Sequence, residues 1–224
     1  MGSGGEWGHV GVIIPCLNEE AAISACVTAV LASGVGEVIV VDGQSTDRTA
    51  ERAAAAGARV VVEPIRGYGQ AMLAGLAALA PTSTVVLFID GDGSDRPDMV
   101  PAILEPIASE RADFVLGSRL GGEREPGSLS AAQIVAGRLA GLTIRLLYGV
   151  RFTDMSPFRA IRRDALERLG MAERGFGWNL EMQMRAAAAG LRIVEIPVGQ
   201  RRRVGGLSKV SGDWRTAARA AFVL

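Results

Sequence analysis

Short runs of apolar, largely β-branched residues recur along the chain, and alanine-rich segments with helical spacing separate them. The runs are continuously apolar and do not alternate, a pattern typical of parallel strands that helices cover on both faces. They predict six strands, at Val10–Ile14, Glu37–Val41, Arg59–Val62, Thr84–Ile89, Phe114–Leu116 and Ile193–Ile196. The other segments predict helices at Glu19–Ala32, Asp47–Ala56, Gly69–Leu79, Pro97–Ala108, Trp178–Ala189 and from Ser130 to about Tyr148. This alternation predicts an α/β fold with a Rossmann-like, mostly parallel sheet and helices on both faces.

Several of the expected helix ends carry sequence signals. Ser45 or Thr46 is expected to cap the second helix. Asp47 is expected to lie in the first turn of that helix, where its negative charge offsets the helix dipole. Gly34 and Gly57 are expected to end the first two helices, because glycine readily adopts the left-handed conformation found there.

Length and composition limit the classes of partner. The 224 residues suffice for one α/β core, so a single domain is expected over residues 1–224, with a mobile loop at Gly121–Gly127. Lys and Arg together number 24, as do Asp and Glu, so no overall basic surface for nucleic acid is indicated. No apolar run reaches the roughly 18 residues of a spanning helix, and no signal peptide is recognisable, so a cytoplasmic location is expected. Cys16 and Cys26 lack the spacing of a metal site and are expected to be buried.

Polar residues gather where the predicted strands end. Pro15 and Glu19 follow the first strand, Asp42 follows the second, and Asp90 and Asp92 follow the fourth. Open parallel sheets bind ligands at the carboxyl ends of their strands, so these residues are expected to meet at one edge. Asp90 and Asp92 flank a glycine that permits close approach of a ligand, and their hard oxygens suit Mg²⁺ or Mn²⁺. Taken alone, the triplet equally fits an ordinary turn.

Several blocks of sequence together resemble the family 2 glycosyltransferases. They are Pro15–Glu19, Val41–Asp47, Gly67–Gly69, Asp90–Asp92, Gly117–Arg119, Thr153–Ile161, Gly177–Met182 and Arg203–Lys209. They occur in the order seen in that family and extend from about Val10 to Gly212. They look most like the branch of dolichyl- and polyprenyl-phosphate mannose and glucose synthases.

The resemblance implies a GT-A fold, inversion at the anomeric carbon, and Mg²⁺ or Mn²⁺ as cofactor. Residues 1–120 would bind a nucleotide diphosphate sugar, with UDP and GDP both left open, and residues 121–212 would bind the acceptor. By position in the motifs, Pro15, Glu19 and Asp42 would hold the nucleoside. Asp90 and Asp92 would hold the metal and the diphosphate, which makes Asp92 a catalytic candidate.

Three cationic residues are the phosphate candidates under this resemblance: Arg119, Arg203 and Lys209. The planar guanidinium fork matches phosphate oxygens, so these residues could clamp either the donor diphosphate or a lipid-phosphate acceptor. We therefore expect transfer of a hexose, glucose or mannose, to a polyprenyl phosphate at the inner face of a membrane. Transfer to a soluble or cell-envelope sugar hydroxyl, a catalytically silent nucleotide-sugar-binding protein, and a nucleotidyltransferase are the alternatives.

Asp154 and Glu181 are the candidates for orienting or deprotonating the acceptor. Asp154 is preferred because it lies in the denser motif, although a helix-capping role or a pairing with Arg159 fits it too. The chain departs from the family pattern at Ser94, where many members have glutamine, and at Leu207, where many have an acid. Both departures are at positions that would help to bind the metal or the donor.

The terminal segment 213–224 is predicted to form an amphipathic helix. Trp214, Ala218, Ala221 and Phe222 share one stripe of it, and Arg215 and Arg219 share another. A peripheral contact with a membrane surface, packing on the domain and a homodimer contact all fit this pattern.

Overall fold

The computed structural model describes residues 6–205. Lys209 and the predicted terminal helix at 213–224 lie outside the described residues, so the expectations for them stay predictions.

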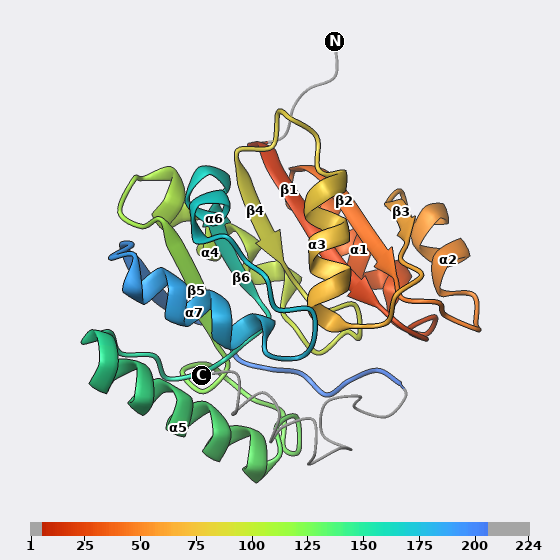
Figure 1. Ribbon diagram of the computed structural model, residues 1–224. Coiled ribbons are helices and arrows are strands. Elements are labelled where there is room, and N and C mark those ends of the chain that lie inside the picture. The colour runs from red at the N-terminus through yellow and green to blue at the C-terminus, as the bar shows by residue number, and fades with distance from the viewer. Residues whose placement is uncertain (1–5, 206–224) are drawn as a thin grey trace.

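A seven-stranded sheet forms the centre of the described chain (Figure 1). Its strands are β1 (Trp7–Cys16), β2 (Val35–Asp42), β3 (Arg59–Val62), β4 (Val85–Phe88), β5 (Phe114–Ser118), β6 (Arg159–Arg162) and β7 (Ile193–Pro197). In space they follow the order β3-β2-β1-β4-β6-β5-β7. Only β6 runs against its neighbours, so the predicted mostly parallel sheet is confirmed, with all six predicted strands in place.

Strand β6 was not predicted, because it is four residues long and has arginine at both ends. Arg159 is nevertheless fully buried. Its guanidinium donates to the backbone oxygens of Ser156 and Asn179 and lies 5.8 Å from the centre of the Phe114 ring. Burial lowers the pKa of Arg159 to about 10, so the side chain still carries its charge at neutral pH. The Ser156 oxygen is local, but the Asn179 oxygen comes from a segment 20 positions away, which the local pattern does not show.

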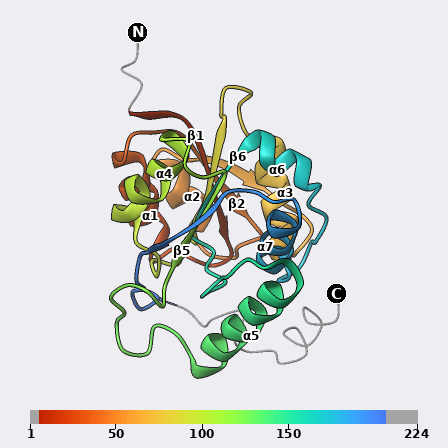
Figure 2. The same ribbon diagram turned by 90° about the vertical axis from the view of Figure 1, so that its left-hand side faces the viewer.

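Helices cover both faces of the sheet, as predicted (Figures 1 and 2). One face carries α1 (Ile23–Ala32), α2 (Thr49–Ala55), the short 3₁₀ helix η1 (Pro97–Met99) and α4 (Val100–Ala108). The other carries α3 (Tyr68–Ala78), α5 (Ala131–Tyr148), α6 (Arg163–Leu169) and α7 (Trp178–Ala188). Trp178 anchors the second layer, since it is fully buried and packs edge-on against Phe88 of β4.

The starts of the first two helices differ from the prediction. The first begins at Ile23 and the second at Thr49, so the predicted cap at Ser45 or Thr46 is wrong. Asp47 lies before its helix and not in the first turn. From this position its carboxylate accepts from the Thr49 amide at 3.0 Å. Ser45, Thr46 and Asp47 instead form hydrogen bonds with the loop after β1. The predicted helix ends are confirmed, because Gly34 and Gly57 have φ of 85° and 101°.

An ion pair joins the starts of β5 and β7. The Asp113 carboxylate accepts from the guanidinium of Arg192 at 2.6 and 2.9 Å and from the Arg192 amide at 3.0 Å. Hydrogen bonding from Arg192 lowers the pKa of Asp113 to about 2 against the opposing effect of burial. The folded pKa lies below the unfolded value of about 4, so the stabilisation is present above pH 4 and is lost as pH falls toward 2.

Replacing Asp113 by asparagine should therefore lower the free energy of unfolding at pH 7 by about 1 kcal/mol. Urea unfolding at pH 7 and pH 3 measures the difference between wild type and variant, which should be smaller at pH 3. An equal difference at both values would show that the ion pair does not carry the effect.

Candidate functional site

Strand direction brings the candidate residues to one edge of the sheet. The carboxyl ends of β1, β2, β4, β5 and β7 share that edge, since these strands run in the same direction. Strand β6 runs the other way, so the segment that precedes it, residues 153–158, arrives at the same edge. This is why Asp154 lies beside Arg119 although 35 residues separate them.

The loops after β1 and β2 are tied together. Asn18, with a φ of 54°, accepts from the Thr46 amide at 2.8 Å, and its own amide donates to Ser45 Oγ at 2.8 Å. The Glu19 amide donates to Thr49 Oγ1 at 2.8 Å. These cross-links explain the late starts of α1 and α2, because the residues expected in their first turns bond to the opposite loop.

Asp42 lies at the end of β2 within this framework and is buried. Its Oδ2 accepts from the Ser45 amide at 3.1 Å, whereas its Oδ1 has no hydrogen-bond partner among the described residues. A buried carboxylate oxygen without a partner is costly, and a ligand hydroxyl or N–H would satisfy it. Pro15 belongs to the same edge, at the end of β1 beside Val41.

Three carboxyl groups crowd the turn after β4. Asp90 and Asp92 were predicted there, whereas Asp95 was not singled out, and it accepts from the Asp90 amide at 2.9 Å. Burial, with the nearby charges of Asp95 and Asp92, raises the pKa of Asp90 well above its ordinary value. Burial likewise raises the pKa of Asp95 to about 7. The turn thus crowds together carboxyl groups whose ionised forms a bound cation would favour.

The residues at this turn fit a divalent cation. Within residues 6–205 no group of three or more His, Cys, Asp or Glu side chains is arranged to hold a metal alone. Mg²⁺ is commonly bound by one or two carboxylates together with substrate phosphates and water, and Asp90 and Asp92 supply such a pair. A β-carbon at Gly91 would collide with Cys16 Sγ, so only glycine allows the turn to lie this close to β1.

Tyr68, at the start of α3, contacts the Asp90 carboxylate. Its hydroxyl donates to Asp90 Oδ1 at 3.4 Å, and its ring stacks on Phe176. Sequence reasoning included Tyr68 only as part of a family block and gave it no role. The signal was weak because a lone tyrosine between glycines has many uses.

Arg203 folds back onto the turn. Its guanidinium pairs with Asp92 at 3.0 Å and also with Glu19, so it joins the loops after β4 and β1. The backbone beside it is held too, since the Arg201 amide donates to the Ser94 oxygen at 2.9 Å and the Val204 amide to the Asp92 oxygen at 3.1 Å. The predicted phosphate ligand therefore lies beside the predicted metal ligand.

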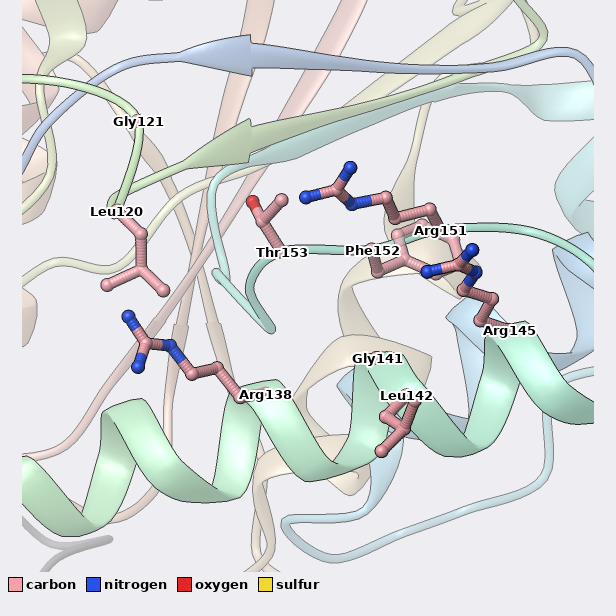
Figure 3. Close-up of a pocket in the computed structure, with 9 residues that line it drawn as sticks. All are labelled: Leu120, Gly121, Arg138, Gly141, Leu142, Arg145, Arg151, Phe152 and Thr153. Atoms are coloured by element: carbon pink, nitrogen blue, oxygen red, sulfur yellow. The ribbon is translucent and has the colours of Figure 1, made fainter.

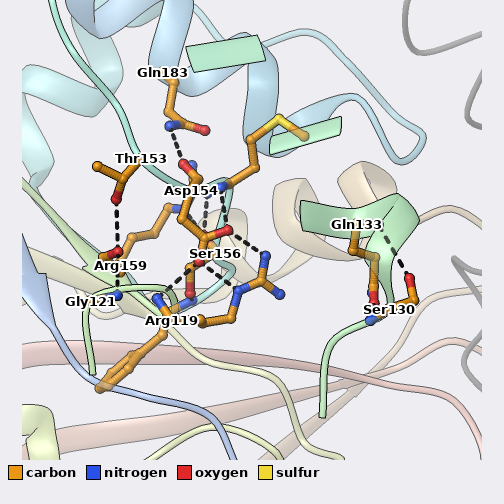
Figure 4. Close-up of polar contacts among 12 residues, drawn as sticks. Arg119, Gly121, Ser130, Gln133, Thr153, Asp154, Ser156, Arg159 and Gln183 are labelled. Carbon is orange, nitrogen blue, oxygen red and sulfur yellow. Dashed lines mark hydrogen bonds and ion pairs between the residues drawn. The ribbon is translucent and has the colours of Figure 1, made fainter. Parts of the chain in front are cut away.

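Arg119 and Asp154 form a nearly buried ion pair, with 12% and 3% of their side chains exposed (Figure 4). The carboxylate accepts from Arg119 Nε at 2.8 Å, from its Nη2 at 2.7 Å and from its amide at 2.9 Å. Burial alone would raise the pKa of Asp154, but the hydrogen bonds and charge of Arg119 outweigh it and hold that pKa below its ordinary value. The alternative pairing of Asp154 with Arg159 is wrong, because Arg159 bonds to backbone oxygens instead.

Glu181, the other acceptor candidate, lies elsewhere. It accepts from the amides of Ala172 and Glu173 and pairs with Arg185, so it organises the loop before α7. Sequence reasoning missed Glu195 of β7, which accepts from the Thr153 amide at 2.9 Å and holds the Asp154 segment in place.

The fold has close counterparts among solved structures. Glucosyl-3-phosphoglycerate synthase from Mycobacterium tuberculosis, in complex with Mn²⁺, UDP-glucose and phosphoglyceric acid, superimposes with a TM-score of 0.75 at 25% identity. The match covers 95% of this chain and 76% of that one. A structure of the same enzyme with Mg²⁺ and UDP gives a TM-score of 0.75 at 27% identity. The chain thus has the GT-A glycosyltransferase fold expected from the sequence.

Sequence comparison identifies the family. The model described as Glycosyl transferase family 2 matches residues 11–170, and the chain belongs to that family of glycosyltransferases. An uncharacterised glycosyltransferase of Mycobacterium tuberculosis is 41% identical over 208 residues, which cover 92% of this chain and 91% of the relative. The polyprenol monophosphomannose synthase of Mycolicibacterium smegmatis is 30% identical over 218 residues, covering 90% and 81%. The family resemblance drawn from the motifs is confirmed.

Proposed function

We propose that the chain transfers a hexose, glucose or mannose, from a nucleotide diphosphate sugar to a polyprenyl phosphate, with inversion. The observation that carries the choice of acceptor is the state of Asp154, which Arg119 holds as a carboxylate with a lowered pKa. A sugar hydroxyl needs a base to remove its proton, and such a carboxylate is a weak base. A phosphate acceptor is already an anion near neutral pH and needs orientation only. The name of the Mycolicibacterium smegmatis relative supports the same acceptor class.

The donor would lie over the ends of β1, β2 and β4. Asp42 has an unsatisfied, buried oxygen for a ribose hydroxyl or a base N–H, and Pro15 and Glu19 line the neighbouring loop. Both UDP and GDP fit this description, because the groups that these residues address are common to the two nucleotides.

Asp90 and Asp92 would hold Mg²⁺ or Mn²⁺, which when bound offsets the charge that develops on the leaving diphosphate. Arg203 lies against Asp92 and would be within reach of the same phosphates. Lys209, outside the described residues, is proposed as a further phosphate ligand on its motif alone.

In the transfer step, an oxygen of the acceptor phosphate forms a bond to the anomeric carbon. The bond from that carbon to the donor phosphate oxygen breaks, and the nucleoside diphosphate leaves with the bonding electron pair. Attack from the face opposite the leaving group inverts the anomeric centre. The Arg119–Asp154 pair would fix the acceptor side of this arrangement, with Arg119 drawing the acceptor phosphate toward the site.

No helix within residues 6–205 has the length and apolarity needed to cross a membrane. We propose a peripheral contact with the inner face of a membrane, where a polyprenyl phosphate would present its head group. A soluble or cell-envelope sugar hydroxyl is the alternative acceptor, and a silent nucleotide-sugar binder the alternative role.

Incubation of the full chain with labelled UDP- and GDP-hexoses, Mn²⁺ and polyprenyl phosphate tests the proposal. Label should pass into the organic phase after lipid extraction and be released from the product by mild acid. Label that appears only on water-soluble sugars would refute the lipid acceptor. Nucleotide binding without any transfer in either phase would identify a silent binder.

A further inference from the structure

A pocket lies between α5 and the segments that follow Arg119 and precede Asp154 (Figure 3). Its volume is about 440 Å³. The lining combines three arginines with three apolar side chains: Arg138, Arg145, Arg151, Leu120, Leu142 and Phe152. Figure 3 shows the side chains of Arg138 and Arg145 rising from α5 on the same side of the helix. Cationic and apolar walls together match a ligand that has an anionic group and an apolar part.

No acidic side chain within residues 6–205 pairs with the arginines of this pocket. Arg138, Arg145 and Arg151 form no ion pair and no side-chain hydrogen bond with any other part of residues 6–205. The sequence of α5 contains no Asp or Glu, so no acid on the helix balances them. Three guanidinium groups thus line one pocket without a charged partner among these residues, and an anion with several oxygens would complement them.

The packing of α5 determines the positions of Arg138 and Arg145. Gly141 is buried against the backbone oxygen of Phe152, and a β-carbon there would collide with that oxygen. Arg138 and Arg145 lie three residues before and four residues after Gly141, so they share its face of the helix. The GxxxG spacing of Gly137 and Gly141 therefore serves close packing of α5 on the Asp154 segment and brings both arginines to it.

The pocket adjoins the proposed acceptor side of the active site. Thr153 lines the pocket and is the residue before Asp154. Its Oγ1 lies 2.8 Å from Ser118 Oγ, and Ser118 precedes Arg119. Leu120, on the other wall, directly follows Arg119. An anion held in the pocket would be next to the ion pair that we assign to orienting the acceptor.

An apolar stripe continues from the pocket along the outer face of α5. Val135, Leu139, Leu142 and Leu146 recur at helical spacing and have 54%, 59%, 52% and 77% of their surface exposed. Leu142 belongs to both the stripe and the pocket wall. Exposed apolar residues are ordinary singly, but a continuous stripe beside a ligand pocket indicates an interaction site.

We propose that this pocket binds the phosphate of the acceptor, a phosphate monoester carried on an apolar chain that leaves along the α5 stripe. The assignment of the ligand as acceptor rests on the proposed hexosyl transfer. Arg138, Arg145 and Arg151 bind the phosphate oxygens, and Leu139, Leu142 and Leu146 contact the first units of the chain. The test must separate a lipid-borne phosphate from a soluble phosphate ester, because the arginines recognise the group that the two share.

The test uses the full chain and direct binding of two probes, a short-chain isoprenyl phosphate and glycerol 3-phosphate. Arg138→Gln, Arg145→Gln and Arg151→Gln should each weaken binding of the isoprenyl phosphate roughly tenfold, the effect of one lost charge-assisted hydrogen bond. Arg168→Gln, on exposed α6, removes the same charge and should leave binding unchanged. Leu139→Ser with Leu146→Ser should weaken binding of the isoprenyl phosphate only. Binding of UDP or GDP with Mn²⁺, measured in parallel, should stay constant in all variants.

Each outcome separates the pocket from the proposed function. Isoprenyl phosphate binding that is absent in the wild type, or unchanged in all three arginine variants, overturns the pocket even if hexosyl transfer occurs. Equal binding of both probes, with the leucine variant neutral, overturns the apolar chain and leaves a soluble phosphate ester as ligand. Binding that depends on the arginines, without transfer from any donor, supports the pocket as a phosphate site and refutes the proposed hexosyl transfer.

Discussion

Replacing Asp92 by asparagine is expected to lower metal-dependent hexosyl transfer about a thousandfold, equivalent to about 4 kcal/mol of transition-state stabilisation. The change keeps the shape of the side chain but removes one of two anionic ligands from the turn after β4. It also deprives Arg203 of a charged partner, which should loosen the segment over the turn. Initial rates measured across a titration of Mn²⁺ give both the maximal rate and the apparent metal affinity.

The control for this variant is Asp164→Asn, which removes one carboxylate charge from an exposed ion pair on α6. Its transfer rate and its thermal unfolding should match those of the wild type. The unfolding midpoint of Asp92→Asn in the absence of metal should change by a few degrees at most. A transfer rate within a few-fold of wild type at saturating Mn²⁺ would remove Asp92 from the metal site.

The largest effect on stability is expected at the Arg119–Asp154 pair. Asp154→Ala leaves the Arg119 guanidinium nearly buried without its carboxylate, and breaking one side of a buried pair costs about 3–5 kcal/mol. The double variant Arg119→Met with Asp154→Leu should recover much of this loss while remaining inactive, because it removes the stranded charge together with its partner. Urea unfolding at pH 7 measures the free energies.

The exposed pair of Asp164 and Arg168 is the matched control, since Asp164→Ala should cost well under 1 kcal/mol. The folded pKa of Asp154 lies below its ordinary value, so its contribution is present above about pH 4 and is lost as pH falls through the folded pKa. The difference in free energy of unfolding between wild type and Asp154→Ala should therefore become smaller at acidic pH. A loss no larger than that of the exposed pair would mean that the buried pair contributes little.

The fold could be predicted from the sequence where the signals were local. Continuous apolar runs located six strands, and the glycines at 34 and 57 located two helix ends. The prediction failed where a distant segment competed for the local groups. Ser45 and Thr46 bond to the loop at Asn18 and do not cap α2, and β6 is a strand despite the arginines at its ends.

The residues of the candidate site likewise fall into those that local signals predicted and those that depend on distant segments. Pro15, Asp42, Asp90 and Asp92 were found because each follows a strand predicted from the sequence, and strand ends meet at one edge of any parallel sheet. Asp95, Tyr68 and the three arginines of the α5 pocket were missed, since their roles depend on which distant side chains face them. Gly137 and Gly141 were visible as a spacing, but only the packed helix shows that they serve contact with the Asp154 segment.

The sequence by itself determined the strands, the edge where the acids gather and the family, because these depend on local periodicity and on short motifs. The tertiary structure alone decided the partners: Asp154 with Arg119, Arg203 with Asp92 and Glu19, and α5 against residues 152–154. The three ion pairs join residues from 35 to 184 positions apart. They follow from the order and direction of the strands, above all the antiparallel β6, which no local pattern in the chain encodes.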